Sequence, residues 1–304
     1  MTTLAAFVAA ELDRALPPEI AAAAERLAAE LDGCAVLFYG SVLRTGDLDG
    51  VLDFYVLTDG QRRRGLRGLA NRWLWPDVSY HEFAIAGRTI RAKVATMPLA
   101  TFTAAAGGRF LDTTIWTRFV QPAVLAWSSN AEAAEAVRAG VAAAVVTAAR
   151  FAAALGPERG PARDYWRALF AATYRTELRV ERPGREGQII GHAPARFDML
   201  LPLAWEAAGL AFEHDRETLI PRLAAADRRR LLAAWRRRRR AGKPLNLARL
   251  AKAAFTFDGA ARYALWKVER HTGLHVPLTP WRERHPILAA PGVLWRVWRT
   301  AGQR

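Results

Sequence analysis

Two apolar runs joined by a glycine-containing loop constrain the fold of this chain more than any other feature of its sequence. The first run covers residues 35–39 and the second covers 51–57. Both have the length and the aliphatic and aromatic content of buried strands. Gly40 and Gly46 lie in the loop, and glycine is the residue that sharp turns accept most readily. The stretch therefore predicts a strand, a tight loop and a second strand.

The sequence around these strands predicts a small mixed α/β module. Residues 1–31 are rich in alanine and place leucine and isoleucine along one side, as in amphipathic helices, with a pair of prolines as the interruption. After the second strand, residues 62–75 have the length of a helix. The runs 80–85 and 89–95 then predict a β-hairpin.

From about Leu111 onward the pattern is helical, which predicts a second, mostly helical region. Linkers rich in glycine, proline or charge are expected between these helices, at 156–160, 182–192 and 242–244. The helices themselves are expected at 130–155, 162–174, 195–211, 216–240 and 245–272.

Charge and composition limit the functions open to this chain. Its 304 residues carry 44 Lys and Arg against 29 Asp and Glu, a formal net charge of +15, and this excess calls for an anionic partner such as nucleic acid, nucleotide phosphates or a membrane surface. The single cysteine, Cys34, excludes an internal disulfide, and with only six scattered histidines it argues against a structural zinc site. No stretch approaches the roughly 18 apolar residues of a spanning helix. Glu11 and Asp13 lie where a signal peptide needs an apolar core, so we expect a soluble, cytosolic-type protein.

Three residues of the strand–loop–strand stretch are suited to phosphate chemistry. Gly40 allows backbone amides to approach a phosphate closely, and Ser41 adds a hydroxyl donor. Asp53 is a carboxylate inside the second apolar run, where a charge is costly unless it is paired or binds a metal. Holding Mg²⁺ against a triphosphate is one such role. The alternatives are a buried, hydrogen-bonded structural acid at Asp53 and an ordinary turn residue at Ser41.

This stretch resembles the signature of the polymerase-β-type nucleotidyltransferase superfamily, in which a hydrophobic strand, Gly-Ser and an acid-containing strand follow one another. The resemblance implies an α/β nucleotidyltransferase module with a mixed sheet, in which carboxylate-bound Mg²⁺ activates a nucleophile. The chain departs from the usual pair of acids because Val51 stands two residues before Asp53. We therefore expect Asp49, in the preceding loop, as the second catalytic and metal-binding carboxylate. Lys93 lies near the place of a third acid and is expected to bind the triphosphate; an edge-strand lysine reaching into water is the alternative.

More of the chain resembles the mitochondrial-type phosphatidate cytidylyltransferases, which make CDP-diacylglycerol from CTP and phosphatidic acid. The resemblance implies CTP binding by Gly40, Ser41 and Lys93, and substrate binding by Glu177 and Arg179, for which a surface pair at a helix end is the alternative. Asp112 lies in one of the segments that carry the resemblance, but its simplest interpretation is as a helix N-cap. The segments that carry the resemblance are Tyr39-Gly40-Ser41, 52–59 with its Asp53-Phe54, 90–94 around Lys93, 111–116 with 119–122, and 174–179.

A basic, tryptophan-containing C-terminal region predicts contact with an anionic membrane. Arginine runs at 228–230 and 236–240 flank Leu231, Leu232 and Trp235, and the tail adds Trp281, Trp295 and Trp298 among arginines. Aromatic and aliphatic residues on one face with cations on the other are typical of a helix lying in a membrane interface. Nucleic acid is the less favoured partner for the same surface.

These inferences give four expected regions and one leading function. The regions are N-terminal helices at 1–31, a nucleotidyltransferase α/β domain at 32–125, a helical domain at 126–278 and a membrane-facing tail at 279–304. The function is a Mg²⁺-dependent phosphatidate cytidylyltransferase, cytoplasmic and peripheral on the inner face of the membrane. The alternatives are nucleotide transfer to RNA, protein or a small molecule, and a catalytically degenerate binding module on the membrane.

Overall fold

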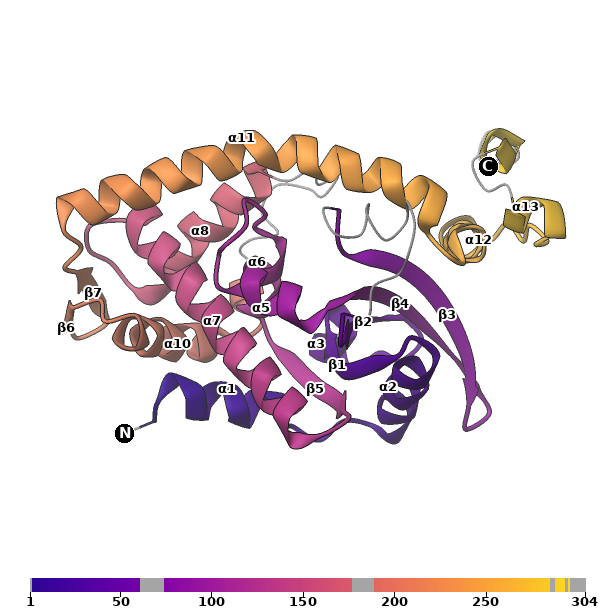
Figure 1. Cartoon of the computed structure of the whole chain (residues 1–304), viewed down its shortest axis with the longest axis horizontal. Helices are drawn as coiled ribbons and strands as arrows, with labels where there is room; N and C mark the ends of the chain where they lie inside the picture. Colours follow the sequence, from indigo (N-terminus) through magenta and orange to yellow (C-terminus); the bar gives the residue numbers. More distant parts are fainter. Residues whose placement is uncertain (1, 61–73, 177–188, 285–287, 293–294, 296–304) are drawn as a thin grey trace.

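The two apolar runs form neighbouring antiparallel strands at the centre of a five-stranded sheet (Figure 1). The computed structural model of the chain describes residues 2–60, 74–176, 189–284, 288–292 and 295. The strands of the sheet lie in the order β3-β4-β2-β1-β5. Their bounds are β1 Gly33–Tyr39, β2 Val51–Thr58, β3 Asp77–Ile85, β4 Arg88–Pro98 and β5 Ala123–Ser128.

The sheet is mixed, as the sequence predicted, because one of its four pairings is parallel. β4 pairs antiparallel with β3, which confirms the predicted hairpin, and pairs parallel with β2. β1 pairs antiparallel with both β2 and β5. Parallel neighbours cannot be joined by a tight hairpin, and here the chain between β2 and β4 includes β3, which returns it to the start of β4. The helix expected at 62–75 falls almost entirely outside the described part of the chain.

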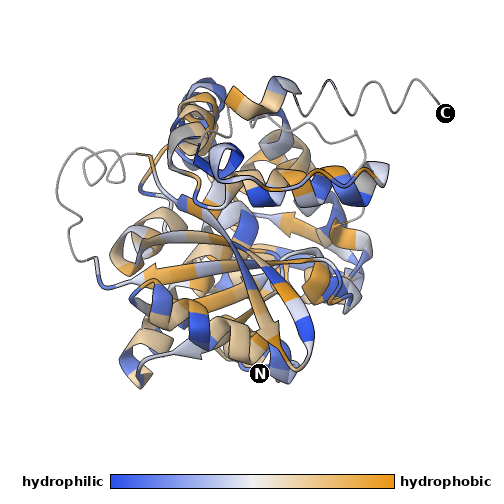
Figure 2. Ribbon diagram, turned by 90° about the vertical axis from the view of Figure 1, so that its right-hand side faces the viewer, coloured by the Kyte–Doolittle hydropathy of each residue, from blue (hydrophilic) through white to orange (hydrophobic). Residues whose placement is uncertain are grey.

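Alternation along the strands divides the interior into two cores, one on each face of the sheet. On one face, Val36, Phe54 and Val94 pack against α2 (Pro18–Glu30). On the other, Leu37, Tyr55 and Met97 pack beneath the helices α5 (Leu99–Ala106), α6 (Thr114–Phe119) and α7 (Ala131–Leu155). The strands are accordingly drawn as predominantly hydrophobic in Figure 2.

Helix α7 is the centre of the helical region. It begins at the predicted place because the Asn130 side chain accepts the Ala133 amide at 2.8 Å and caps its first turn. By length and composition α7 could cross a membrane, but 56% of its most apolar window is buried here. It contacts the strands β1 and β5 and the helices α1 (Leu4–Leu12), α5, α6, α8 (Ala162–Thr176), α10 (Pro194–Ala207) and α11 (Ala225–Thr256).

Three predictions of the helical region are wrong. Residues 123–128 form β5, and the helix expected at 216–240 begins only at Ala225, because residues 216–221 belong to the hairpin of β6 (Phe212–Asp215) and β7 (Thr218–Pro221). The linker expected at 242–244 does not exist, since α11 continues through it. Gly242 is buried against α8, where an added Cβ would lie 2.4 Å from the Thr176 carbonyl oxygen. The lack of a side chain at Gly242 therefore allows α11 and α8 to pack closely. The true break precedes α12 (Ala260–Thr272), after which α13 spans Pro280–Arg284.

Trp235 does not face outward with the arginines of α11, contrary to the membrane-face interpretation of that segment. It is buried, and its ring centroid lies 5.6 Å from Phe151 and 6.3 Å from Trp116. Arg238 is also buried, donating to the carbonyl oxygens of Gly108 and Phe110. The inner face of α11 is thus part of the protein core, and only its outer face is available to a partner.

Replacing Trp235 with alanine is expected to lower the free energy of unfolding by about 3–5 kcal/mol, the usual cost of truncating a buried aromatic side chain. Leu250→Ala, on the same helix but 65% exposed, is the control and should change it by less than about 0.5 kcal/mol. Denaturant titration measures both. Equal small losses would place Trp235 outside the core.

Candidate functional site

Gly40 ends β1 in a backbone conformation that only glycine adopts readily. Its φ of 97° and ψ of −161° lie in a region closed to residues with a side chain. An added Cβ would also lie 2.5 Å from the Asp53 carboxylate oxygen Oδ2. Two independent constraints, one from the turn and one from Asp53, therefore require glycine here.

Asp53 lies on the face of β2 that carries Tyr55 and Leu57, beneath α6. It stands opposite Tyr39 of β1 and Lys93 of β4 in the strand register. Neighbours in register point to the same face of a sheet, so Asp53 and Lys93 share a face. Lys93 belongs to an interior strand, which makes the edge-strand interpretation of this lysine wrong.

Four cationic side chains act on the Asp53 carboxylate, and we call the five residues the Asp53 cluster. Burial raises the pKa of Asp53 above its usual value, while the charges of Lys93, Arg118, Arg44 and Lys267 oppose that rise. The four come from different elements: β4, α6, the short helix α3 (Ser41–Thr45) and α12. Within this set of described residues, one carboxylate among four cations leaves an excess of positive charge that attracts a polyanion.

Aromatic rings and a strand-edge contact hold two of these cations in place. The Arg118 guanidinium lies over the Tyr39 ring, 4.8 Å from its centroid, and 5.9 Å from the centroid of Tyr55. Helix α12 is anchored to β3, because the Tyr80 amide donates to the Asp258 carbonyl oxygen at 2.9 Å just before the helix begins. That docking brings Lys267 toward the sheet.

Ser41 and Asp49, two further predicted site residues, are exposed at the surface. Ser41 is the exposed first residue of α3, and its carbonyl oxygen accepts the Thr45 hydroxyl at 3.2 Å. The Asp49 carboxylate is 81% exposed and forms an ion pair with Arg88 at 2.8 Å. A metal ion at Asp49 would therefore compete with Arg88. Glu177 and Arg179 fall outside the described residues.

Asp112 has a structural role, although Thr113 and not Asp112 is the N-cap of α6. Its carboxylate accepts the Thr114 amide at 2.9 Å and the Thr114 hydroxyl at 3.0 Å, and it pairs with Arg249 of α11. Asp112 thus ties the start of α6 to α11. Because α6 carries Arg118, this contact also positions the Asp53 cluster.

Nowhere in the described residues do three or more Asp, Glu, His or Cys side chains gather as a metal cluster. Mg²⁺ is nevertheless often held by one or two carboxylates together with substrate phosphates. Asp53 could hold a Mg²⁺ ion whose other ligands come from a bound nucleotide. It does not form a metal site from protein ligands alone.

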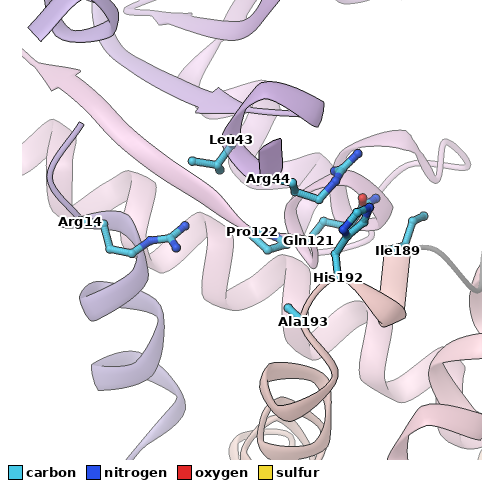
Figure 3. A pocket seen from close by; sticks show the side chains of 8 residues that line it. All are labelled: Arg14, Leu43, Arg44, Gln121, Pro122, Ile189, His192 and Ala193. Atoms are coloured by element: carbon cyan, nitrogen blue, oxygen red, sulfur yellow. The ribbon is translucent and has the colours of Figure 1, made fainter. Parts of the chain in front are cut away.

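A pocket of about 190 Å³ opens beside α3, next to the Asp53 cluster (Figure 3). Arg44 belongs to both, since it lines the pocket and acts on Asp53. Sequence reasoning missed this pocket, together with Arg44, Arg118 and Lys267 of the cluster. The lining residues are Arg14, Leu43, Arg44, Gln121, Pro122, Ile189, His192 and Ala193.

No protein-family model matches this chain, and no curated protein matches it either.

Gly40→Ala is expected to cost about 3 kcal/mol of unfolding free energy, the upper end of the range for strained backbone, because Asp53 must also move. Gly46→Ala at the other end of α3 is the matched control: its φ is 72°, but nothing lies within 4 Å of an added Cβ, so the loss should be about 1 kcal/mol. Denaturant titration compares them. Equal losses would mean that Asp53 does not constrain Gly40.

Asp53→Asn is expected to gain stability relative to the wild type as pH rises. Burial raises the pKa of Asp53 above its usual 3.8, so the folded state holds the proton more tightly than the unfolded state. Ionisation of Asp53 therefore destabilises the wild type as pH passes from the unfolded pKa through the folded one, from about pH 4 upward. The asparagine variant lacks this loss. Unfolding free energies at about pH 4 and about pH 7 test the sign, and a relative loss at the higher pH would show that the cations outweigh burial.

Proposed function

We propose that this protein is a Mg²⁺-dependent nucleotidyltransferase that transfers the cytidylyl group of CTP to phosphatidic acid. The observation that carries the proposal is the position of Asp53, a partly buried carboxylate beside the Gly40 turn and in register with Lys93. Three residues that the sequence resemblance implicates are thereby adjacent in space. The further cations of the Asp53 cluster suit a substrate with several negative charges.

In the proposed reaction, an oxygen of the lipid phosphate attacks the α-phosphorus of CTP. The bond from that phosphorus to the bridging oxygen breaks, and pyrophosphate leaves with the electron pair. A phosphate monoester is already ionised near neutral pH, with a second pKa of about 6, so little proton transfer is needed. Positioning and charge neutralisation then supply most of the catalysis.

Each residue of the site has a definable task in this reaction. Gly40 and Ser41 approach the phosphates of CTP through the backbone and a hydroxyl. Lys93, Arg118 and Arg44 neutralise charge on the triphosphate, and Asp53 holds Mg²⁺. When bound, Mg²⁺ would supply further neutralisation of the leaving pyrophosphate. Asp49 is the second candidate ligand, in competition with Arg88.

The surface of the C-terminal third supports action at a membrane. Among the described residues, six of the nine exposed large hydrophobic side chains come after residue 246. The outer face of α11 adds several exposed cations, each contributing about 1 kcal/mol near an anionic leaflet. The hydrophobic residues are Leu247, Leu250, Leu278, Trp281, Leu288 and Trp295, and the cations are Arg236, Arg237, Arg239, Arg240 and Lys243.

We infer from this surface a peripheral protein on the inner face of the membrane. An anionic lipid would be both substrate and docking partner, which makes a nucleic-acid partner unnecessary for the function. The exposed hydrophobic residues after position 246 are the expected lipid contacts. Trp235 is not among them because it is buried.

Turnover is the direct test of the function. With Mg²⁺ and phosphatidic-acid liposomes, the wild type is expected to form CDP-diacylglycerol from CTP and not from ATP, GTP or UTP. Asp53→Asn should lower the rate by roughly 10³-fold or more, as loss of a central charge-positioning group does. Asp215→Asn, an exposed acid on β6, is the control and should keep the wild-type rate. Wild-type activity in Asp53→Asn would refute the mechanism.

Membrane docking predicts that the double variant Leu247→Ser, Leu250→Ser binds phosphatidic-acid liposomes roughly tenfold more weakly or worse, because each buried methylene contributes about 0.8 kcal/mol. Both side chains are more than half exposed, so folding should be unaffected. Met199→Ser on α10, also exposed, is the matched control. Liposome sedimentation measures binding, and an unchanged double variant would exclude this surface as the membrane contact.

A nucleotide-binding module without catalysis is the second candidate. It is favoured by the arginine partner of Asp49 and by the lack of a three-carboxylate cluster in the part of the chain that the structure describes. Folded, liposome-bound protein that binds CTP but forms no product would select it.

A further inference from the structure

The pocket beside α3 is cationic, and none of its lining residues in the described part of the chain is acidic. In Figure 3 the side chains of Arg44, Gln121 and His192 gather at one side, and Arg14 extends toward the pocket from the other. Guanidinium, amide and imidazole groups all offer N–H donors, the imidazole in either protonation state. Leu43, Ile189 and Pro122 form apolar walls, which strengthen the field of the charges between them.

The elements around the pocket are held together by an ion pair that also engages the carboxylate of Glu11. Arg196 of α10 donates from Nε and Nη2 to the two carboxylate oxygens of Glu11 at 2.6 and 2.7 Å, and from Nη1 to the Val120 carbonyl oxygen at 2.9 Å. Arg14 Nε donates to the Glu11 carbonyl oxygen at 3.2 Å. These contacts fix α1, α10 and the turn before β5 around the pocket, with Glu11 already paired.

Helix α10 adds a further positive contribution. Ala193, which lines the pocket, is the N-cap of this 14-residue helix, and the first turn contains no acid. The Ala193 side chain cannot accept a hydrogen bond from the first turn, so the positive end of the helix dipole beside the pocket has no side-chain cap. The dipole acts here beside two arginines and a histidine.

Size and position point to part of a ligand. Pockets that enclose whole drug-sized ligands span about 300–1,000 Å³, and this one, at about 190 Å³, is smaller. It adjoins the Asp53 cluster through Arg44. A ligand group bound here could therefore belong to a molecule that reacts at Asp53.

We propose that this pocket is a phosphate subsite adjoining the Asp53 cluster, which binds a terminal phosphate group through Arg14, Arg44 and His192. The inference rests on the proposed function for the identity of the ligand. Two sources share this chemistry: the terminal phosphates of CTP and the phosphate of phosphatidic acid. The subsite would hold its phosphate by direct charge-assisted hydrogen bonds and requires no metal.

The test measures binding without Mg²⁺, so that it is independent of turnover. Calorimetric titration uses three probes: pyrophosphate, CTP and short-chain dioctanoyl phosphatidic acid. Arg14→Gln and His192→Gln are the test variants, since Arg44 also acts on Asp53. Arg229→Gln, an exposed arginine on α11, is the control for net charge, and circular dichroism establishes that each variant is folded.

Each test variant is expected to bind one class of probe about tenfold more weakly, as loss of one charge-assisted contact predicts, while the control binds normally. Weakened pyrophosphate and CTP binding would assign the pocket to the nucleotide, and weakened phosphatidic-acid binding would assign it to the acceptor. Either result supports the subsite, even if the wild type makes no product and the proposed function fails. Folded variants that bind every probe like the wild type, or a wild type that binds none, would overturn it.

Discussion

The partial burial of one carboxylate, Asp53, on the helix-covered face of the sheet is the constraint on which the site depends. A buried charge requires opposite charge nearby, and here it comes from elements far apart in sequence. The parallel pairing of β2 with β4 places Lys93 in register with Asp53. The same carboxylate leaves no room for a side chain at Gly40. Strand register, turn geometry and the placement of α3, α6 and α12 are thus coupled through one acid.

The balance of charge around Asp53 determines what this arrangement can do. The four cations of the Asp53 cluster outnumber its one acid, so the cluster favours a polyanion over a bare divalent cation. A nucleotide that brings its own Mg²⁺ satisfies both the acid and the cations. The cationic pocket beside α3 extends the same field away from Asp53. The C-terminal surface, with its exposed leucines and arginines, provides a separate means of reaching an anionic lipid.

Local pattern predicted the strands around the site and the residues they carry, but not the partners that packing brings to them. The alternating and apolar runs identified β1 to β4, and Gly40, Asp53 and Lys93 were expected at one site and are adjacent. Arg44 and Arg118 carried no signal because arginine is abundant throughout the chain. Lys267 did carry one: only four of the 44 basic residues are lysines, and two of these act on Asp53. β5 was missed because a short strand completed by long-range pairing has little periodicity of its own. Gly242 was taken for a linker because the pattern does not reveal that α8 packs against it.

Label transfer tests the central claim, nucleotidyl transfer at Asp53, most directly. CTP labelled in parallel at the α- or the γ-phosphate is incubated with the protein, Mg²⁺ and phosphatidic-acid liposomes, and the lipid is then extracted. The account predicts that the α label enters the lipid and that the γ label is released as pyrophosphate. Label from the γ-phosphate in the lipid would show phosphoryl transfer instead. Lipid free of both labels, from folded and liposome-bound protein, would contradict the enzymatic account.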